Sequence, residues 1–158
     1  MKQHIALSLV LALLTLATVG CGGEKKPSDL PKLYPTTITV TYDDGTPVDG
    51  ANVALMSAQK TSGRTWNLAG VTDASGVIIL MTDGKWNGAP AGEYNAMVIK
   101  EVAEDASEDG TPGPTTVYVD RKFNNPKTSG LTVTVTEGKN EVTLKVGDKI
   151  EELVKGVM

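Results

Sequence analysis

Two residue types with versatile chemistry occur once each in this chain of 158 residues, as His4 and Cys21. Histidine transfers protons near neutral pH and binds metals, and a cysteine thiolate forms thioether bonds, disulfides and metal bonds. Both residues stand near the N-terminus, so the chemistry open to this chain depends on what happens to its first segment.

Residues 1–20 have the pattern of a secretory signal peptide. Lys2 gives a basic start, and residues 5–19 then form an apolar run without charge. The run falls short of the ~20 residues that a helix needs to cross a bilayer, so a permanent transmembrane anchor is the weaker interpretation. We predict that residues 1–20 are removed during export.

The end of the apolar run, Thr18-Val19-Gly20-Cys21, resembles the lipobox of bacterial lipoproteins. The resemblance implies that the Cys21 thiol is alkylated with diacylglycerol, that the chain is cut before Cys21, and that palmitate-type acyl chains hold it on a membrane. Two or more chains anchor stably, whereas one binds marginally. The alternative is an ordinary secreted protein with one unpaired cysteine.

In enteric bacteria, Asp directly after the lipidated cysteine resembles an inner-membrane retention signal, and this chain has Gly22 at that position. The lipobox resemblance implies a cell-envelope location. Without the Asp, it implies the outer membrane or cell surface if the host has an outer membrane.

Loss of residues 1–20 removes the only histidine and leaves carboxylates, lysines, tyrosines and hydroxyls as groups able to do chemistry. Without Lys2, 14 Lys and Arg face 19 Asp and Glu, a formal charge of −5, which argues against a nucleic-acid partner. With His4 gone and Cys21 lipidated, Ser-His-Asp and Cys-His catalysis and the usual zinc and copper sites are excluded. We expect no catalytic residue, no metal site and no cofactor, and hence no enzyme.

Acidic side chains gather between residues 101 and 116, as Glu101, Glu104, Asp105, Glu108 and Asp109. Such oxygen ligands could bind Ca²⁺, but the EF-hand spacing is missing, and a solvated flexible loop is the expected structure. Glycosidase-type catalysis needs two acids across a cleft, whereas the acids here fall mainly in turns and in this loop.

Two aromatic residues are candidate ligand contacts. Trp86 lies in the loop KWNGAP and Tyr118 follows the acidic segment, and exposed aromatic rings stack on sugars. The competing interpretation places these rings in the core, because the whole chain has only seven aromatic residues.

The remaining sequence predicts a tether and a β-rich domain. Residues 21–35 carry the lipidated cysteine and a Gly- and Pro-rich linker. Alternating apolar and polar residues predict strands in the domain, 36–147. The predicted strands cover residues 36–42, 51–59, 65–72, 77–81, 93–100, 131–136 and 141–146. The fold class is therefore all-β, an antiparallel seven-stranded β-sandwich.

Finer expectations accompany these strands. The apolar run 77–81 predicts a strand buried on both faces. The turn 137–140 predicts a hairpin between the last two strands. The C-terminal tail, 148–158, could form a short helix or a frayed end.

Three motifs of this domain, read in order, resemble the carboxypeptidase regulatory-like family, which has a transthyretin-like (prealbumin-like) sandwich. The motifs are GTPVDGANVAL with Gly45, Pro47, Val48, Gly50, Ala51 and Val53, then GVTDASGVIIL with Thr72, Asp73 and Gly76, then GAPAGEYNAMVIK with Pro90, Gly92 and Tyr94. Small lipoproteins with this domain are common in planctomycetes and related bacteria. The resemblance implies an accessory structural or binding module and carries over no active-site residue.

These expectations converge on a non-catalytic β-sandwich anchored in the envelope by lipid on Cys21, with an unidentified envelope protein as partner. The alternative is a glycan- or peptidoglycan-binding module that uses Trp86.

Overall fold

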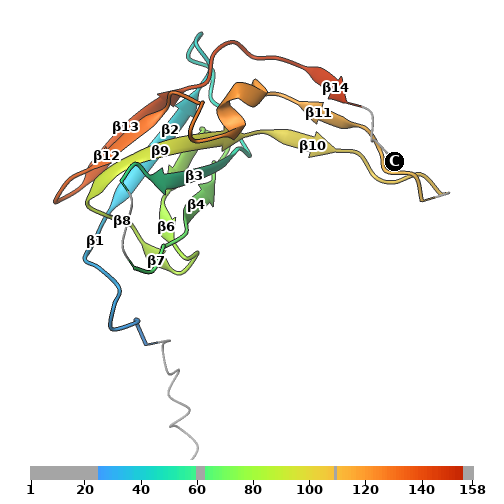
Figure 1. Ribbon diagram of the computed structural model, residues 1–158. Helices are drawn as coiled ribbons and strands as arrows, with labels where there is room; N and C mark the ends of the chain where they lie inside the picture. The colour runs from blue at the N-terminus through green and yellow to red at the C-terminus, as the bar shows by residue number, and fades with distance from the viewer. Residues whose placement is uncertain (1–24, 60–62, 109, 155–158) are drawn as a thin grey trace, which may run out of the picture. The chain divides into compact units, whose positions relative to one another are not determined.

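The computed structural model describes residues 25–59, 63–108 and 110–154. The chain divides into two units, Met1–Leu30 and Pro31–Met158. The described part of the first unit contains a turn closed by the Leu30 N–H, which donates to the Pro27 carbonyl at 3.1 Å. The described part of the second unit is built almost wholly of strands (Figure 1).

All seven predicted strands are present. They are β2 (Thr36–Thr41), β3 (Asn52–Ser57), β4 (Leu68–Val71), β5 (Val77–Ile79), β9 (Gly92–Ile99), β12 (Thr132–Val135) and β13 (Asn140–Lys145). Short elements join them: β1 (Leu33–Tyr34), β6 (Met81–Thr82), β7 (Trp86–Asn87), β8 (Ala89–Pro90) and the 3₁₀ helix η1 (Arg121–Asn124). The all-β prediction is confirmed.

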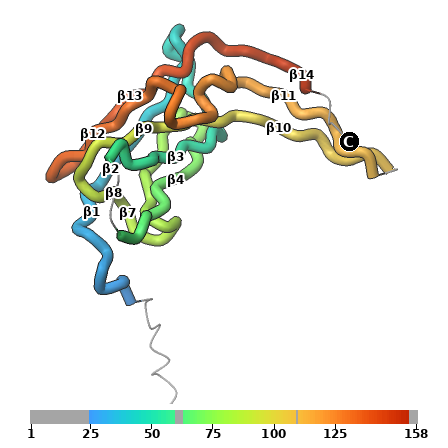
Figure 2. The backbone as a smooth tube through the Cα atoms, in the orientation of Figure 1, coloured from blue at the N-terminus to red at the C-terminus, as the bar shows by residue number. Residues whose placement is uncertain are grey.

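Two sheets face each other across the core. One has the strand order β12-β9-β3-β4-β6-β7 and the other β13-β2-β5. Ile38, Val40 and Leu144 from the small sheet are buried in the same cluster as Val53 and Val98 from the large one. The tube in Figure 2 shows the two layers in the same orientation as the ribbon. Alternation therefore identified the inward faces correctly.

The predicted hairpin between the last two strands is wrong. β12 pairs with β9 in the large sheet, whereas β13 pairs with β2 in the small sheet, in a parallel register from Asn140↔Thr36 to Lys145↔Thr41. The turn 137–140 thus carries the chain from one layer to the other. Alternation reports that one face of a strand is buried, but both layers of a sandwich satisfy that demand equally.

The prediction that residues 77–81 are buried on both faces is also wrong. Ile78 and Leu80 are buried, whereas the side chain of Ile79 is 58% exposed. β5 pairs only with β2, at the edge of the small sheet, and the chain then enters the large sheet as β6. The outward face of β5 is uncovered, so this run alternates although every residue is apolar.

The folded unit starts earlier than the predicted domain. Leu33–Tyr34 forms β1, which pairs with β8, and Tyr34 is buried against the core. The linker predicted over residues 21–35 therefore includes a strand at its end.

The two ends of the segment predicted as an acidic loop and part of the predicted C-terminal tail form a third sheet, whereas residues 104–108 and 110–114 connect its strands without regular structure. β10 (Glu101–Ala103) and β11 (Thr115–Val117) pair as a hairpin, and β14 (Glu152–Val154) pairs with β11. Glu152–Val154 is a strand and not part of a helix. A ten-residue helix is marginal in isolation because its nucleation is costly, whereas a strand at this position pairs with β11. We call the sheet β10-β11-β14 the arm; Figure 1 shows it continuing from the end of β9.

Glycines stand at two tight turns of the sandwich. Gly50 and Gly76 have φ of +60° and +71°, a conformation that favours glycine. Asp73 Oδ1 accepts hydrogen bonds from the N–H groups of Ser75 and Val77, at 2.8 and 3.0 Å, which closes the turn before β5.

Candidate interaction sites

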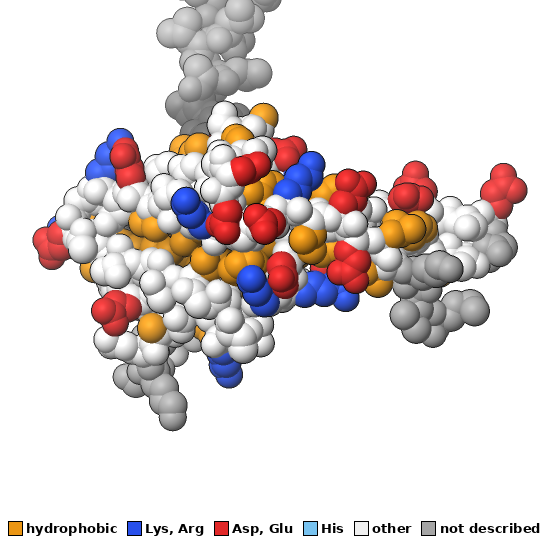
Figure 3. Space-filling view, turned by 90° about the horizontal axis from the view of Figure 1, so that it is seen from above, with side chains coloured by type: hydrophobic (Ala, Val, Ile, Leu, Met, Phe, Trp, Pro, Cys, Tyr) orange, Lys and Arg blue, Asp and Glu red, His pale blue; other side chains and the backbone are white. Residues whose placement is uncertain are grey.

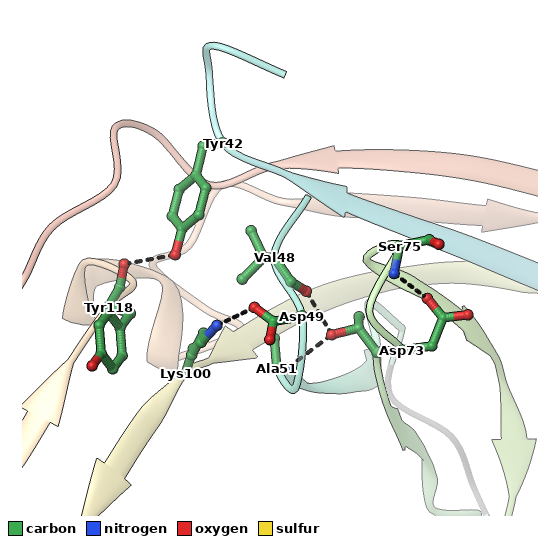
Figure 4. Close-up of polar contacts among 9 residues, drawn as sticks. Tyr42, Val48, Asp49, Ala51, Asp73, Ser75, Lys100 and Tyr118 are labelled. Atoms are coloured by element: carbon green, nitrogen blue, oxygen red, sulfur yellow. Dashed lines mark hydrogen bonds and ion pairs between the residues drawn. The ribbon is translucent and has the colours of Figure 1, made fainter. Parts of the chain in front are cut away.

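A polar cluster joins the arm to the sandwich at Lys100, the residue between β9 and β10. The Lys100 ammonium group makes an ion pair with the Asp49 carboxylate, and its Nζ lies 5.4 Å from the centroid of the Tyr118 ring. Figure 4 shows Lys100 and Asp49 pointing toward each other, with Tyr118 beside Lys100. Lys100 is mostly covered, so these contacts fix the start of the arm.

A second bond crosses the same joint. The Tyr42 hydroxyl donates to the Tyr118 carbonyl at 3.1 Å (Figure 4). Burial raises the pKa of Tyr42, and the carboxylates of Asp49 and Asp44 raise it further. The hydroxyl therefore keeps its proton and remains a donor well above neutral pH.

The turn that carries Asp49 is held by one buried hydroxyl. Thr72 Oγ1 donates to the Val48 carbonyl at 2.6 Å and accepts from the Ala51 N–H at 2.8 Å. Val48 and Ala51 flank Asp49 on the turn in Figure 4. The side chain of Thr72 thus fixes the backbone on both sides of Asp49, so that its carboxylate meets Lys100.

The electrostatics of this joint favour a structural role. A hydrogen bond from Lys100, followed by its positive charge, lowers the pKa of the Asp49 carboxyl. Asp49 is consequently ionised at neutral pH and acts as the partner of Lys100. A general acid or base would instead need a pKa near the working pH.

The two tryptophans meet at the edge of the large sheet. The rings of Trp66 and Trp86 are 6.2 Å apart at an interplanar angle of 84°. The Arg64 guanidinium lies 4.0 Å from the centre of the Trp66 ring and donates to Asp83 Oδ2 at 3.1 Å. Trp66 packs against the core, and Trp86 is partly exposed.

The two predicted aromatic contacts belong to different sites. Trp86 lies on β7 at the end of the large sheet, whereas Tyr118 follows β11 at the base of the arm. Tyr118 is occupied by Lys100 and Tyr42, which makes it part of the joint. No local pattern indicates this role, because the partners of Tyr118 lie far from it along the chain.

The arm is the third candidate site, and sequence reasoning missed it as a surface. Val102, Thr116 and Leu153 are aligned across its three strands on one face. The side chains of Val102 and Leu153 are 51% and 59% exposed. Apolar residues that are aligned on an uncovered sheet face are typical of an interaction surface.

The remaining predicted features are placed as follows. Cys21 lies outside the described residues. Within the described ranges, no three His, Cys, Asp or Glu side chains are grouped so that they could hold a metal ion. Helices long and apolar enough to span a membrane are likewise absent from this part of the chain.

Comparisons with known proteins give limited similarity. No family model matches the chain, and no curated protein matches it either. Among solved structures, the major pilin subunit of Bacillus cereus is 21% identical with a TM-score of 0.41, over 76% of this chain and 31% of the pilin. A 9R-lipoxygenase from Cyanothece is 17% identical with a TM-score of 0.40, over 77% of this chain and 18% of the enzyme. The chain thus spans less than a third of either protein, and likeness at this level carries no argument about function.

Proposed function

We propose that this protein is a non-catalytic envelope module, anchored by lipid on Cys21, that binds a partner protein through the arm. The observation that carries the proposal is the aligned, uncovered row of Val102, Thr116 and Leu153. A β-sheet face of this kind buries apolar area when a partner covers it, and free strand edges offer backbone hydrogen bonds in addition.

The chemistry of the residues supports a non-catalytic role. The chain has one histidine and one cysteine, both within its first 21 residues. The polar side chains gathered at the joint, Asp49, Lys100 and Tyr42, bond to one another or to backbone. A module that presents a surface needs such rigid contacts and no reactive group.

The anchoring half of the proposal rests on the sequence around Cys21, which follows an apolar run directly and resembles a lipobox. Metabolic labelling with a fatty-acid probe tests it. We expect the parent protein to be labelled and to fractionate with membranes, and the Cys21→Ser variant to lose both properties. Equal labelling of the two proteins would refute the anchor.

Photo-crosslinking in native membranes tests the interaction half. A photoreactive residue replaces Leu153 on the arm or, as a matched control, Val71 on β4, since both side chains are 59% exposed. We expect a discrete crosslinked envelope protein from position 153 and none from position 71. Absence of a product at 153, or the same products at both positions, would reject the arm as the interaction surface.

A glycan-binding function is the second candidate, and the Trp66–Trp86 pair favours it. Trp86 is partly exposed and contacts Trp66, whose ring is covered by the guanidinium of the Arg64–Asp83 pair, so aromatic rings and hydrogen-bonding side chains occur at one site. Retention on peptidoglycan tests this function. Trp86→Ala should abolish retention and Trp86→Phe, which keeps a ring, should preserve part of it. A parent protein that is not retained would end the glycan hypothesis.

A further inference from the structure

The charges of the chain are divided between the arm and the rest. Residues 101–117 and 150–154, which contain the strands of the arm and their connection, hold seven Asp and Glu and no Lys or Arg. Without Lys2, the chain has 19 acidic and 14 basic residues, so the remainder has 12 and 14 and a formal charge of +2. The acidity of the protein therefore resides in the arm.

The acidic and apolar side chains of the arm are exposed together. Glu104, Glu108 and Glu151 are exposed, as are Val102 and Leu153. Figure 3 shows acidic side chains along the arm, with hydrophobic side chains at the surface among them. The surface of the arm therefore combines an apolar row with negatively charged side chains around it.

The arm also presents open strand edges. β3 accompanies β9 as far as the Asn52↔Ile99 pair, and among the described residues β10 beyond it pairs with β11 alone. In the same part of the chain, β14 is paired on one side, with β11. Unpaired N–H and C=O groups on such edges accept an added extended strand.

The charge and the apolar row of the arm distinguish between two candidate binding partners, a second copy of this chain and a basic segment of another protein. A second copy docked arm to arm would bring two strongly acidic segments together, and like charges placed in one interface are repulsive. A partner segment that carries Lys or Arg beside apolar residues would match both the charge and the apolar row. We propose that the arm binds a basic, amphipathic segment of a partner protein in extended conformation, an inference that rests on the proposed interaction function.

Binding of a defined peptide to the full chain in non-ionic detergent micelles tests this partner class. The probe is a short labelled peptide of alternating lysine and valine, and the control peptide replaces each lysine with glutamate. Fluorescence anisotropy measures both. We expect the lysine peptide alone to bind, and its affinity to fall as salt is raised, because the charges involved are exposed.

Matched variants locate the binding. Glu104→Gln with Glu108→Gln removes two exposed carboxylates from the arm, and Glu93→Gln with Glu137→Gln removes two exposed carboxylates elsewhere. We expect the arm pair to weaken binding about fivefold, as for two exposed ion pairs, and the control pair to leave it unchanged.

The apolar row has its own matched pair. Leu153→Thr and Val71→Thr each replace an apolar residue that is 59% exposed with threonine, a β-branched residue suited to strands. We expect about a tenfold loss for Leu153→Thr and no change for Val71→Thr. Tryptophan emission, which reports on Trp66 and Trp86 in the sandwich, verifies that each variant is folded.

Several outcomes would overturn the proposal. They are equal binding by the arm and control variants, equal binding of the glutamate peptide, self-association abolished by Leu153→Thr, and arm-dependent binding to phosphatidylglycerol vesicles. If the peptide fails while crosslinking from position 153 still captures one envelope protein, the proposed function stands and the basic partner class falls. If both fail, the interaction function itself is rejected.

Discussion

Replacing Thr72 with valine should be among the most damaging conservative substitutions in this protein. The Thr72 hydroxyl donates to the Val48 carbonyl and accepts from the Ala51 N–H, at 2.6 and 2.8 Å. Thr72 is 4% exposed, and both partner residues are fully buried. Thr72→Val preserves the shape of the side chain and removes both bonds, and water cannot readily replace them.

The expected loss follows from the two orphaned groups. A buried N–H or C=O left without a partner costs about 1–3 kcal/mol, so two of them lower the free energy of unfolding by about 3 kcal/mol. Thr72→Ser keeps both bonds and loses one buried methyl group, which costs about 1 kcal/mol. The serine variant is therefore the matched control.

Urea denaturation followed by tryptophan fluorescence measures the difference. With a slope of about 2 kcal/mol/M, the midpoint of Thr72→Val should fall by about 1.5 M, and that of Thr72→Ser by about 0.5 M. If Thr72→Val unfolds within about 0.5 kcal/mol of the parent, or if serine costs as much as valine, the hydroxyl does not hold the Asp49 turn in the way that we describe.

Three other perturbations test further contacts. Gly76→Ala would place a Cβ 2.5 Å from the Val40 carbonyl oxygen at a φ of +71° and should lower the free energy of unfolding by about 3 kcal/mol. Gly45→Ala, where the space is open, should lower it by about 1 kcal/mol. Equal urea midpoints for the two variants would contradict this. Ser129→Ala removes a buried hydroxyl that donates to the Ala96 carbonyl at 2.7 Å. The free energy of unfolding should fall by about 1–2 kcal/mol, which a lower melting temperature would show. The pKa of Asp49 is lowered by Lys100, so the stabilisation from this pair is present above the ordinary carboxyl pKa and disappears as pH falls through the lowered value. An NMR titration should place the Asp49 midpoint below 3.8, and Lys100→Met should return it toward that value; an unchanged midpoint would exclude the ion pair.

Much of the sandwich was predictable because its strands are half-buried. In β2, Ile38 and Val40 point inward between threonines that are less buried, and the same alternation marks β9 and β12. The glycine of a tight turn is equally local, since Gly76 needs a positive φ whatever the strand partners are. The ring of Tyr94 is likewise buried from the inward face of its strand, and its hydroxyl donates to the nearby Pro90 carbonyl at 2.8 Å.

The candidate sites were less predictable, because their partners are distant in sequence. Lys100 meets Asp49 and Tyr118, and Tyr42 meets the Tyr118 carbonyl 76 positions away. The acidic and Gly/Pro-rich composition of residues 101–116 predicted a loop, and no local pattern in three-residue strands such as β10 and β14 could have outweighed it. Trp86 was identified from its type, but its perpendicular contact with Trp66 was not.

The sequence by itself determined the residues that face inward, the turns that need glycine, the absence of a second cysteine or histidine, and the setting of Cys21 after an apolar run. These properties depend on residue type and short-range periodicity. Only the tertiary structure decided that β13 runs parallel to β2, that β14 joins β11, and that Val102 and Leu153 share one open face. Strand pairing joins segments that are far apart in the chain, and its energy depends on which edges remain free once the core has formed, which periodicity along the chain does not encode.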